Sequence, residues 1–302
     1  MKSKGFTLIE ILVTTTIMVL LAGFAIQITG QVINVWSRSS AKLATVAEAR
    51  VAMDVIANDL EGIVLRNDGY EWFRAENDFL KEPANTLSTA LRFFSVIKDK
   101  TIDSEGRTIP GDISAIAYNL HYVNPIDGSN QGKKSFVLYR MEVDPEKTYN
   151  LLLDPSTREF LPNKRSSIWG QGNVIKGKNG GNYLAMNIVK FEIDFHVEDD
   201  GDRTTPTLYF ERSKKNPRRS VIYGGKSATI GPQAKLEHYQ RALAYADIKL
   251  TVLSDEGAEI MRNVEQRSMT SEEVIRLHGE EFIRRVHSVS YTHLTLPTIY
   301  SV

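Results

Sequence analysis

Residues 4–10 read KGFTLIE, and residues 11–28 continue as the almost unbroken apolar run ILVTTTIMVLLAGFAIQI. Lys2 and Lys4 precede the run, and because flanking lysines resist translocation, they are expected on the cytoplasmic side with the run in a bilayer. Glu10 does not fit this simple pattern, because a carboxylate in hydrocarbon costs roughly 2.5 to 3.5 kcal/mol on insertion scales. Glu10 should therefore lie near an end of the span, be paired with a cation, or be functional.

The string from Lys4 to Glu10 resembles the processing site of type IV prepilins and of the pseudopilins of type II secretion systems. The resemblance implies that a prepilin peptidase, a membrane-embedded aspartic peptidase, cuts between Gly5 and Phe6 and methylates the new N-terminus at Phe6. Glu10 then becomes the fifth residue of the mature chain, where it would meet the N-terminal ammonium of a neighbouring subunit. Such pairing is favourable because each charge is costly when isolated in a low dielectric.

Three other interpretations of this segment compete with the prepilin one. A secretory signal peptide would end in a small-residue cleavage site, of which residues 22–25 (AGFA) are a poor version, and normally has no acid at its entrance. A plain signal anchor explains the apolar run but does not explain the presence of Gly5, Phe6 and Glu10. A buried soluble helix is disfavoured, because the run approaches the roughly 20 residues that span a bilayer.

Composition sets further bounds on the class of protein. The chain has 302 residues, enough for one large domain or two small ones, and its 37 Lys+Arg balance its 37 Asp+Glu. No global field therefore points to nucleic acid as a partner. Cysteine is absent, which excludes disulfides, thiol catalysis and cysteine metal sites. Many pilins pin their C-terminal region with a disulfide, so the chain departs from that pattern.

The apolar run is predicted to be the first half of one long helix over residues 6–64. No proline interrupts this range, and Leu43, Val46, Met53, Ile56, Leu60 and Val64 recur at helical spacing. We expect residues 1–5 to be a leader, 6–35 a transmembrane and filament-core helix, and 36–64 its amphipathic second half. Residues 65–288 would form a periplasmic α+β pseudopilin domain.

Strand patterns follow the helix, with β-branched and aromatic residues bounded by turn formers. They are found at residues 90–97, 113–123, 135–143, 183–197 and 245–253, and residues 206–211 could pair back. Residues 70–89 are predicted to be a loop with room for a short helix. Residues 273–285 are predicted to be an amphipathic helix with a cap at Ser271. The pattern predicts an α+β fold in which a long N-terminal helix packs on an antiparallel sheet, the pilin-like arrangement that the resemblance implies. The pair 113–123 and 135–143 also resembles the globular domain of the minor pseudopilin J.

The last residues raise a separate question about the gene. Residues 289–298 (VSYTHLTLPT) match the translation of a widely used transposon sequencing adapter. We expect residues 289–302 to be an adapter artefact that replaces the natural C-terminus, so they carry no functional argument.

No constellation of catalytic residues is apparent, and no cofactor is expected. The 6 histidines are scattered without metal spacing, and His121 and His196 lie in predicted strands, where a sheet-surface imidazole is the simpler interpretation. Asp199, Asp200 and Asp202 are weak calcium candidates, because hard cations bind clustered carboxylates, but a hairpin tip explains them better.

These observations favour a non-enzymatic, pilin-like structural subunit: a minor pseudopilin of a type II secretion pseudopilus or of a related type IV filament. The resemblance implies a bacterial inner-membrane protein with one span and a periplasmic C-terminal domain. Its partners would be the prepilin peptidase, other pilins or pseudopilins, an inner-membrane assembly platform and an ATPase. Alternatives are a minor pilin of an adhesion or DNA-uptake pilus, an exported enzyme with a signal anchor, and a membrane-anchored binding protein that never polymerises. The last would hold a ligand with residues 144–182 and the basic cluster 214–219.

Overall fold

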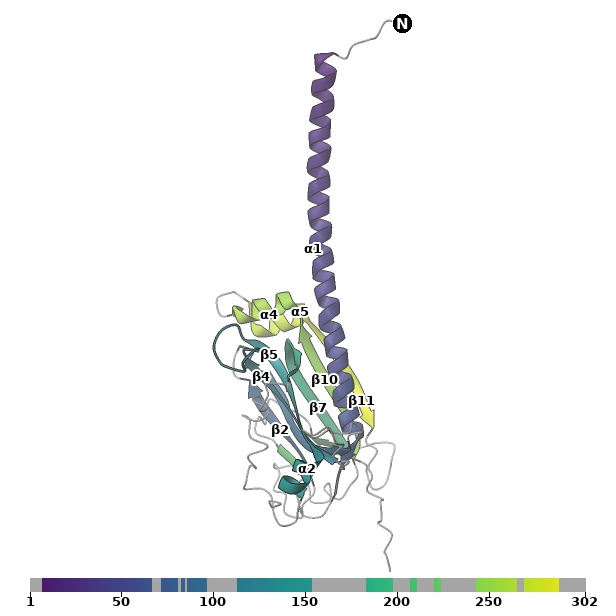
Figure 1. The fold of residues 1–302 in the computed structure, drawn as a ribbon, viewed down its shortest axis with the longest axis vertical. Coiled ribbons are helices and arrows are strands. Elements are labelled where there is room, and N and C mark those ends of the chain that lie inside the picture. The colour runs from purple at the N-terminus through teal and green to yellow at the C-terminus, as the bar shows by residue number, and fades with distance from the viewer. Residues whose placement is uncertain are drawn as a thin grey trace, which may run out of the picture. The chain divides into compact units, whose positions relative to one another are not determined.

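The computed structural model describes residues 7–66, 72–80, 83–84, 86–96, 113–153, 183–197, 207–210, 220–223, 243–264 and 269–287. The chain divides into two compact units, Met1–Ala44 and Thr45–Val302. Helix α1 (Leu8–Glu61) is one continuous helix of 54 residues that contributes to both units (Figure 1). The single long helix predicted from the sequence is therefore confirmed.

Helix α1 ends where Gly62 brings the backbone against strand β3 (Thr86–Val96). The Gly62 carbonyl accepts a hydrogen bond from the Val96 amide at 2.8 Å. A Cβ at position 62 would lie 2.6 Å from the Ser95 Oγ and 2.7 Å from the Val96 carbonyl oxygen, so this close approach requires glycine. The chain then forms β1 (Ile63–Val64), antiparallel to β3, so the prediction of helix up to residue 64 is wrong for these two residues.

The larger sheet has 7 strands in the order β6-β5-β4-β3-β2-β9, with β1 paired to β3, and every pairing is antiparallel. Its other strands are β2 (Phe73–Leu80), β4 (Ile113–Val123), β5 (Ser135–Val143), β6 (Tyr183–Met186) and β9 (Ser220–Tyr223). The hairpin of β4 and β5 has the predicted bounds, with Val123 opposite Ser135.

The smaller sheet has 4 antiparallel strands in the order β11-β10-β7-β8. They are β7 (Ile188–Val197), β8 (Thr207–Phe210), β10 (Leu243–Leu253) and β11 (Gly279–His287). The single strand predicted over residues 183–197 is wrong in one respect, because it breaks at Asn187 and sends β6 and β7 into different sheets. Asn187 has a φ of 58°, a left-handed conformation that asparagine tolerates better than most residues.

One apolar core joins the second half of α1 to the inner faces of both sheets. The helix contributes three alanines and three larger residues to this core: Ala49, Ala52, Ala57, Met53, Ile56 and Leu60. The fully buried members include Ala49, Ile56, Ala57, Ile116, Leu120, Phe191, Ile193, Phe195, Ile248 and Leu250. Leu43, which the sequence placed on the buried stripe, is 70% exposed, because it lies in the first compact unit, ahead of the part of α1 that packs.

Two side-chain hydroxyls also connect the two sheets. Thr86 Oγ1 donates to the Val189 carbonyl at 3.2 Å, and Thr89 Oγ1 accepts from the Ile193 amide at 3.2 Å. Both threonines are buried, so these bonds satisfy polar groups that the core would otherwise leave unpaired.

The remaining helices are short: α2 (Pro145–Thr148), a π-helical turn η1 (Tyr149–Leu153), α4 (Asp255–Arg262) and α5 (Ser271–His278). The helix predicted over residues 273–285 is wrong after His278. The cap is at Thr270 rather than at the predicted Ser271, and Thr270 forms a capping box with Glu273. From Gly279 onward the chain is a strand that pairs with residues 245–253 of β10. After β10 the chain enters α4, whose N-cap is Ser254; its side chain accepts from the Gly257 amide at 3.2 Å.

The loop predicted over residues 70–89 is also wrong, because it contains β2 and the start of β3. β2 is polar in sequence, and it pairs with β3 on one edge and β9 on the other, so backbone pairing rather than composition defines it. The expectations for residues 198–206, 211–219 and 289–302, and for most of 144–182, lie outside the described residues.

Candidate functional site

The N-terminal end of α1 is organised by Thr7 and Glu10. The Glu10 Oε2 accepts hydrogen bonds from the Thr7 backbone amide at 2.9 Å and from the Thr7 hydroxyl at 2.8 Å. In return, the Glu10 backbone amide donates to Thr7 Oγ1 at 3.4 Å. This is the reciprocal arrangement of a capping box, with Thr7 before the helix and Glu10 in its first turn. The helix start is therefore fixed by the residue that the sequence singled out for a charge role.

The expected cut site adjoins this box in the chain. Gly5 and Phe6 lie outside the described residues, so their assignment as processing residues stays a prediction. A cut between them would leave an ammonium on Phe6, four positions before Glu10.

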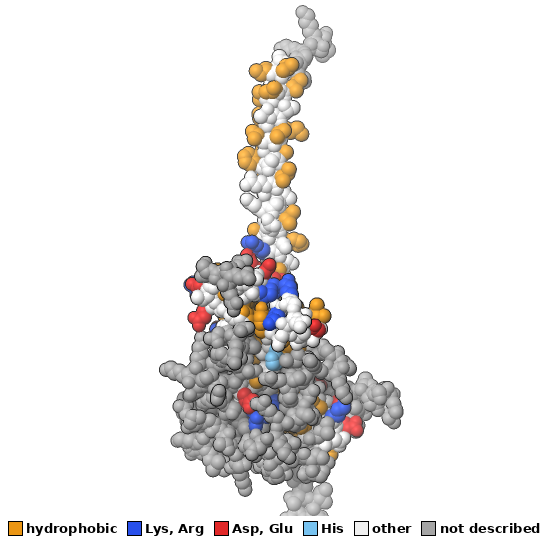
Figure 2. All heavy atoms as spheres, turned by 90° about the vertical axis from the view of Figure 1, so that its left-hand side faces the viewer, with side chains coloured by type: hydrophobic (Ala, Val, Ile, Leu, Met, Phe, Trp, Pro, Cys, Tyr) orange, Lys and Arg blue, Asp and Glu red, His pale blue; other side chains and the backbone are white. Residues whose placement is uncertain are grey.

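Beyond the box, α1 exposes an apolar surface along the first compact unit. An 18-residue window of the helix has a mean hydropathy of 2.2, and none of that window is buried, so the helix is long and apolar enough to cross a membrane. Figure 2 shows these apolar side chains as orange spheres along the helix. The exposed large apolar residues include Leu8, Ile11, Leu12, Met18, Leu20, Leu21, Phe24, Ile28, Ile33 and Trp36. A soluble monomer rarely exposes an apolar surface of this extent.

Comparison with known families addresses the same segment. Residues 1–26 match the prokaryotic N-terminal methylation motif. This match confirms that residues 4–10 resemble the processing site of prepilins. The closer resemblance to the minor pseudopilin J stays a prediction. The chain is also similar to the structure of a type IV-like pilin from Thermus thermophilus, with 9% identity over 80% of this chain and 95% of that one. The TM-score of that likeness is 0.34. Among curated proteins no match is found.

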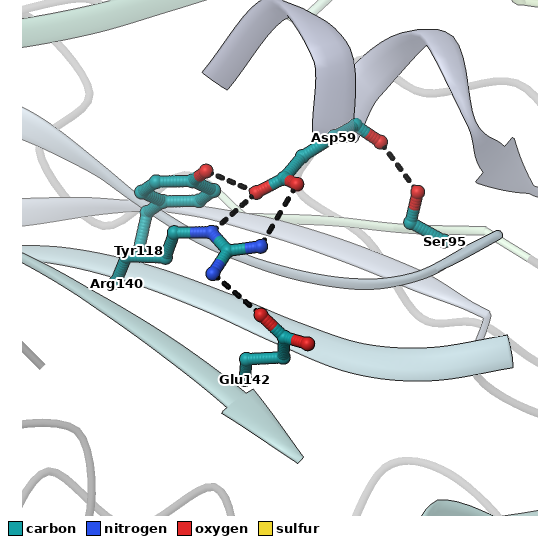
Figure 3. A network of polar contacts seen from close by, with 5 residues as sticks. All are labelled: Asp59, Ser95, Tyr118, Arg140 and Glu142. Carbon is teal, nitrogen blue, oxygen red and sulfur yellow. Dashed lines mark hydrogen bonds and ion pairs between the residues drawn. The ribbon is translucent and has the colours of Figure 1, made fainter. Parts of the chain in front are cut away.

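A second polar cluster, which we call the Asp59 clamp, ties the helix that follows the methylation motif to the larger sheet (Figure 3). Arg140 on β5 donates from Nε to the Asp59 Oδ2 at 2.7 Å and from Nη2 to Oδ1 at 3.0 Å. The Tyr118 hydroxyl on β4 donates to the same carboxylate, and Ser95 Oγ on β3 donates to the Asp59 carbonyl at 2.7 Å. Glu142 accepts from Arg140 Nη1 at 2.6 Å.

The Asp59 clamp contains an ion pair that is largely shielded from solvent. The Asp59 side chain is 8% exposed and that of Arg140 is 20% exposed. Burial and the nearby negative charge of Asp59 raise the pKa of Tyr118 well above its ordinary value, so this phenol stays neutral and donates. Burial alone would lower the pKa of Arg140, but the hydrogen bonds and charge of Asp59 outweigh it, so the pKa is raised and the guanidinium stays charged.

Two further contacts join α1 to the strands. Glu48 accepts from the Met186 backbone amide at 2.9 Å and from the Tyr183 hydroxyl, so it contacts the last and the first residue of β6. Burial, followed by the hydrogen bond to Glu48, raises the pKa of Tyr183. Arg284 of β11 forms an ion pair with Asp54. The second half of α1 is thus held by charged or hydrogen-bonded contacts to both sheets.

His196 lies on the outer face of the smaller sheet, in contact with aromatic and charged side chains. The His196 ring stacks on Tyr245 with centroids 4.3 Å apart, and its Nε2 is 3.8 Å from Asp247. Burial lowers the pKa of His196, with the charge of Asp247 opposing the shift. Arg285 forms two hydrogen bonds to Asp247, at 2.8 and 2.9 Å, and these lower the pKa of Asp247. His196 is therefore engaged in a sheet-surface cluster.

Metal binding has no support within the part of the chain that the structure describes, where no group of three His, Asp or Glu residues is arranged to hold an ion. The calcium candidates Asp199, Asp200 and Asp202 lie outside that part.

Sequence reasoning missed two of these features for different reasons. The capping box was readable, because Thr7-Leu8-Ile9-Glu10 has the spacing of Ser/Thr-x-x-Glu, but the apolar run obscured it as a helix start. The Asp59 clamp was not readable, because Asp59 and Arg140 are 81 positions apart and nothing local distinguishes them.

Proposed function

We propose that the chain is a non-enzymatic, pilin-like structural subunit, processed after Gly5, methylated at Phe6 and anchored in the bacterial inner membrane by the first half of α1. The observation that carries the proposal is the match to the methylation motif over residues 1–26, which extends into the first part of α1, a helix whose apolar surface is unburied in this segment. A filament of such helices would cover that surface by van der Waals packing between neighbouring helices.

The finer assignment is a minor pseudopilin of a type II secretion pseudopilus, with its C-terminal domain in the periplasm. The size of the unit Thr45–Val302 supports a minor rather than a major subunit, and a minor pilin of a related type IV filament has the same features. The partners would be the prepilin peptidase, neighbouring pseudopilins, and an inner-membrane platform with its assembly ATPase. Deletion of the gene would abolish protein export for a pseudopilus subunit and spare it for an adhesion or DNA-uptake pilus.

Glu10 would act in assembly by pairing with the methylated ammonium of a neighbouring Phe6. The capping box gives this role a competitor, because Glu10 already serves its own helix through Thr7. Two variants separate these roles. Glu10→Gln keeps a side-chain oxygen that can accept from Thr7 but removes the charge, whereas Thr7→Ala removes the cap and keeps the charge.

The test is incorporation of each variant into filaments in a host with its own peptidase and assembly machinery. A charge role predicts that Glu10→Gln is cleaved and inserted yet fails to assemble, while Thr7→Ala assembles. If Glu10→Gln assembles as well as the unaltered chain, the ion-pair role is wrong. If Glu10→Ala leaves the biological function untouched, polymerisation is not the function and a membrane-anchored binding protein is the better account.

A further inference from the structure

The loop between β4 and β5 presents an apolar side chain to solvent. It comprises residues 124–134 (NPIDGSNQGKK), which we call the β4–β5 tip. Its one large aliphatic residue, Ile126, is 93% exposed, the highest value among the exposed large apolar residues of the described chain. Lys133 and Lys134 lie in the same loop, and Asp127 is its one acid, so the tip carries a net positive charge.

The backbone that carries Ile126 is held by hydrogen bonds within the tip. The Asn124 amide donates to the Ser129 carbonyl at 2.9 Å, and the Asn124 carbonyl accepts from the Gly128 amide at 2.8 Å. The Asn124 side chain accepts from the Ile126 amide at 3.0 Å, and that of Asp127 accepts from the Ser129 amide at 2.9 Å. Because the loop is ordered before any contact forms, a contact made by Ile126 costs little conformational entropy.

The β4–β5 tip lies at the end of the second unit where α1 enters it. At the base of the tip, Ser135 Oγ donates to Asn187 Oδ1 at 2.8 Å. The preceding residue, Met186, donates from its amide to Glu48, which follows closely on Thr45, the first residue of the unit. Helix α2 lies at the opposite end (Figure 1).

The bilayer that holds α1 is a surface the tip can reach. Trp36 is the expected interface residue, and only residues 37–44 separate it from the second unit. Even as an extended chain these residues span no more than about 30 Å, so the unit stays close to the bilayer. Such tethering raises the effective concentration of lipid at the tip, and a contact too weak for a free protein can therefore form.

The chemistry of the tip fits an anionic lipid surface. A segment that lies in the headgroup region presents aliphatic side chains to the acyl boundary and lysines to the lipid phosphates. Ile126 supplies the first of these, and Lys133 and Lys134 supply the second. Helix α4, which bonds to Asn187 at the same end of the unit, carries three acids, Asp255, Glu256 and Glu259. The electrostatic attraction is therefore confined to the tip.

We propose that the β4–β5 tip contacts the surface of the membrane in which α1 is anchored. Ile126 enters the headgroup region, and Lys133 and Lys134 bind the phosphates of anionic lipid. The contact orients the second unit on the membrane before the subunit enters a filament, and it is lost when the subunit leaves the bilayer. This inference rests on the membrane insertion of α1 that is part of the proposed function.

The absence of cysteine allows a direct test in the full-length protein, reconstituted in vesicles of phosphatidylethanolamine and phosphatidylglycerol. Asn130→Cys places a bimane fluorophore on the exposed tip and leaves Ile126 in place. Tyr149→Cys places the same label on η1, which follows α2, at a residue that is 56% exposed. Doxyl groups near the headgroup end of the acyl chains quench a label that reaches lipid, whereas iodide quenches a label in water.

We expect doxyl quenching to be roughly fivefold stronger at position 130 than at position 149. Ile126→Ser should lower the equilibrium constant of the contact roughly tenfold, and it leaves the core intact because the Ile126 side chain is exposed. Lys133→Gln should lower that constant roughly fivefold, as should replacing phosphatidylglycerol with phosphatidylcholine. Lys147→Gln on α2 is the matched control and should have no effect.

Three results would overturn the proposal. The first is equal doxyl quenching at the two positions, and the second is quenching at position 130 that Ile126→Ser does not change or that neither Lys133→Gln nor the loss of phosphatidylglycerol changes. The third is a tip label shielded from iodide but not quenched by doxyl, which would identify a protein contact instead.

The same preparation distinguishes this inference from the proposed function. The protein is recovered from membranes of a host with its prepilin peptidase, so its N-terminus and its membrane retention are measured first. A processed chain that begins at Phe6 and stays in the vesicles, but whose tip label is not quenched, refutes the lipid contact and leaves the proposed function intact. A chain that is not retained in the membrane refutes both.

Discussion

Arg140→Met should strongly destabilise the second compact unit, because it removes one partner of a buried ion pair. In the native chain the Asp59 carboxylate accepts two hydrogen bonds from Arg140 and one from Tyr118, and its side chain is 8% exposed. With the guanidinium gone, only the phenol remains to solvate a carboxylate that water barely reaches. Removing one partner of a buried pair costs about 3 to 5 kcal/mol, and we expect a loss in this range.

The assay is urea denaturation of the full chain in detergent, followed by tryptophan fluorescence. Trp72 is buried and packs edge-on against Phe94 at 5.2 Å, so its emission reports unfolding of this unit. Glu142→Gln is the matched control, because Glu142 touches the same guanidinium from a more exposed position and should cost less than about 1 kcal/mol.

A double variant distinguishes the loss of the attraction between Asp59 and Arg140 from the cost of leaving the Asp59 carboxylate buried without a partner cation. Asp59→Asn in the Arg140→Met background removes the uncompensated carboxylate and should recover more than half of the lost free energy of unfolding, because a neutral amide is far less costly to bury than a charge. The reasoning is refuted if Arg140→Met costs less than about 1 kcal/mol, or if Asp59→Asn adds its own cost to Arg140→Met without recovery.

Three further predictions concern other parts of the second unit. The raised pKa of Tyr118 means that the folded state holds the phenol proton more tightly than the unfolded state does. The contribution of Tyr118 to the free energy of unfolding is therefore constant below the unfolded tyrosine pKa of about 10 and falls above it. Urea titrations across this pH range should show a shallower fall in the free energy of unfolding for Tyr118→Phe. Gly62→Ala should lower the free energy of unfolding by about 1 to 3 kcal/mol, because its Cβ would lie 2.7 Å from the Val96 carbonyl oxygen; no change in the urea midpoint would contradict that close approach. By NMR, His196 should titrate with a pKa below its ordinary value, and Asp247→Asn should lower that pKa further, since Asp247 is the charge that opposes the shift; a rise would show that the assigned sign is wrong.

The features that the sequence predicted well are those with a local signal. The long helix follows from the absence of proline and from apolar spacing, and its end follows from Gly62. The β4–β5 hairpin was predicted with its observed bounds, because both strands are rich in β-branched and aromatic residues and a Pro-Ile-Asp-Gly loop separates them. In these segments the local preference and the tertiary environment favour the same structure.

Predictions were wrong where tertiary pairing overrode the local pattern. Residues 279–287 follow a capped helix, and their two glutamates precede two arginines by four positions, a spacing that suits continuation of the helix. They nevertheless pair with residues 245–253 of β10. β2 is polar enough to resemble a loop and is a strand because it has partners on both edges. The break at Asn187 depends on one residue in the left-handed region, which changes the sheet that the chain joins.

The candidate site also has a part that the sequence could predict and a part that it could not. Gly5, Phe6 and Glu10 form a contiguous string and could be proposed from the sequence alone. The Asp59 clamp needed the fold, because its charged partners come from α1 and β5 and its phenol from β4.

The central claim is most directly tested by the mass of the N-terminal peptide of the protein recovered from membranes of a host that contains its prepilin peptidase. The account predicts a peptide that begins at Phe6 and carries one methyl group. A peptide that begins at Met1, or after Ala25, would contradict it and would leave an anchored or secreted protein without a filament role.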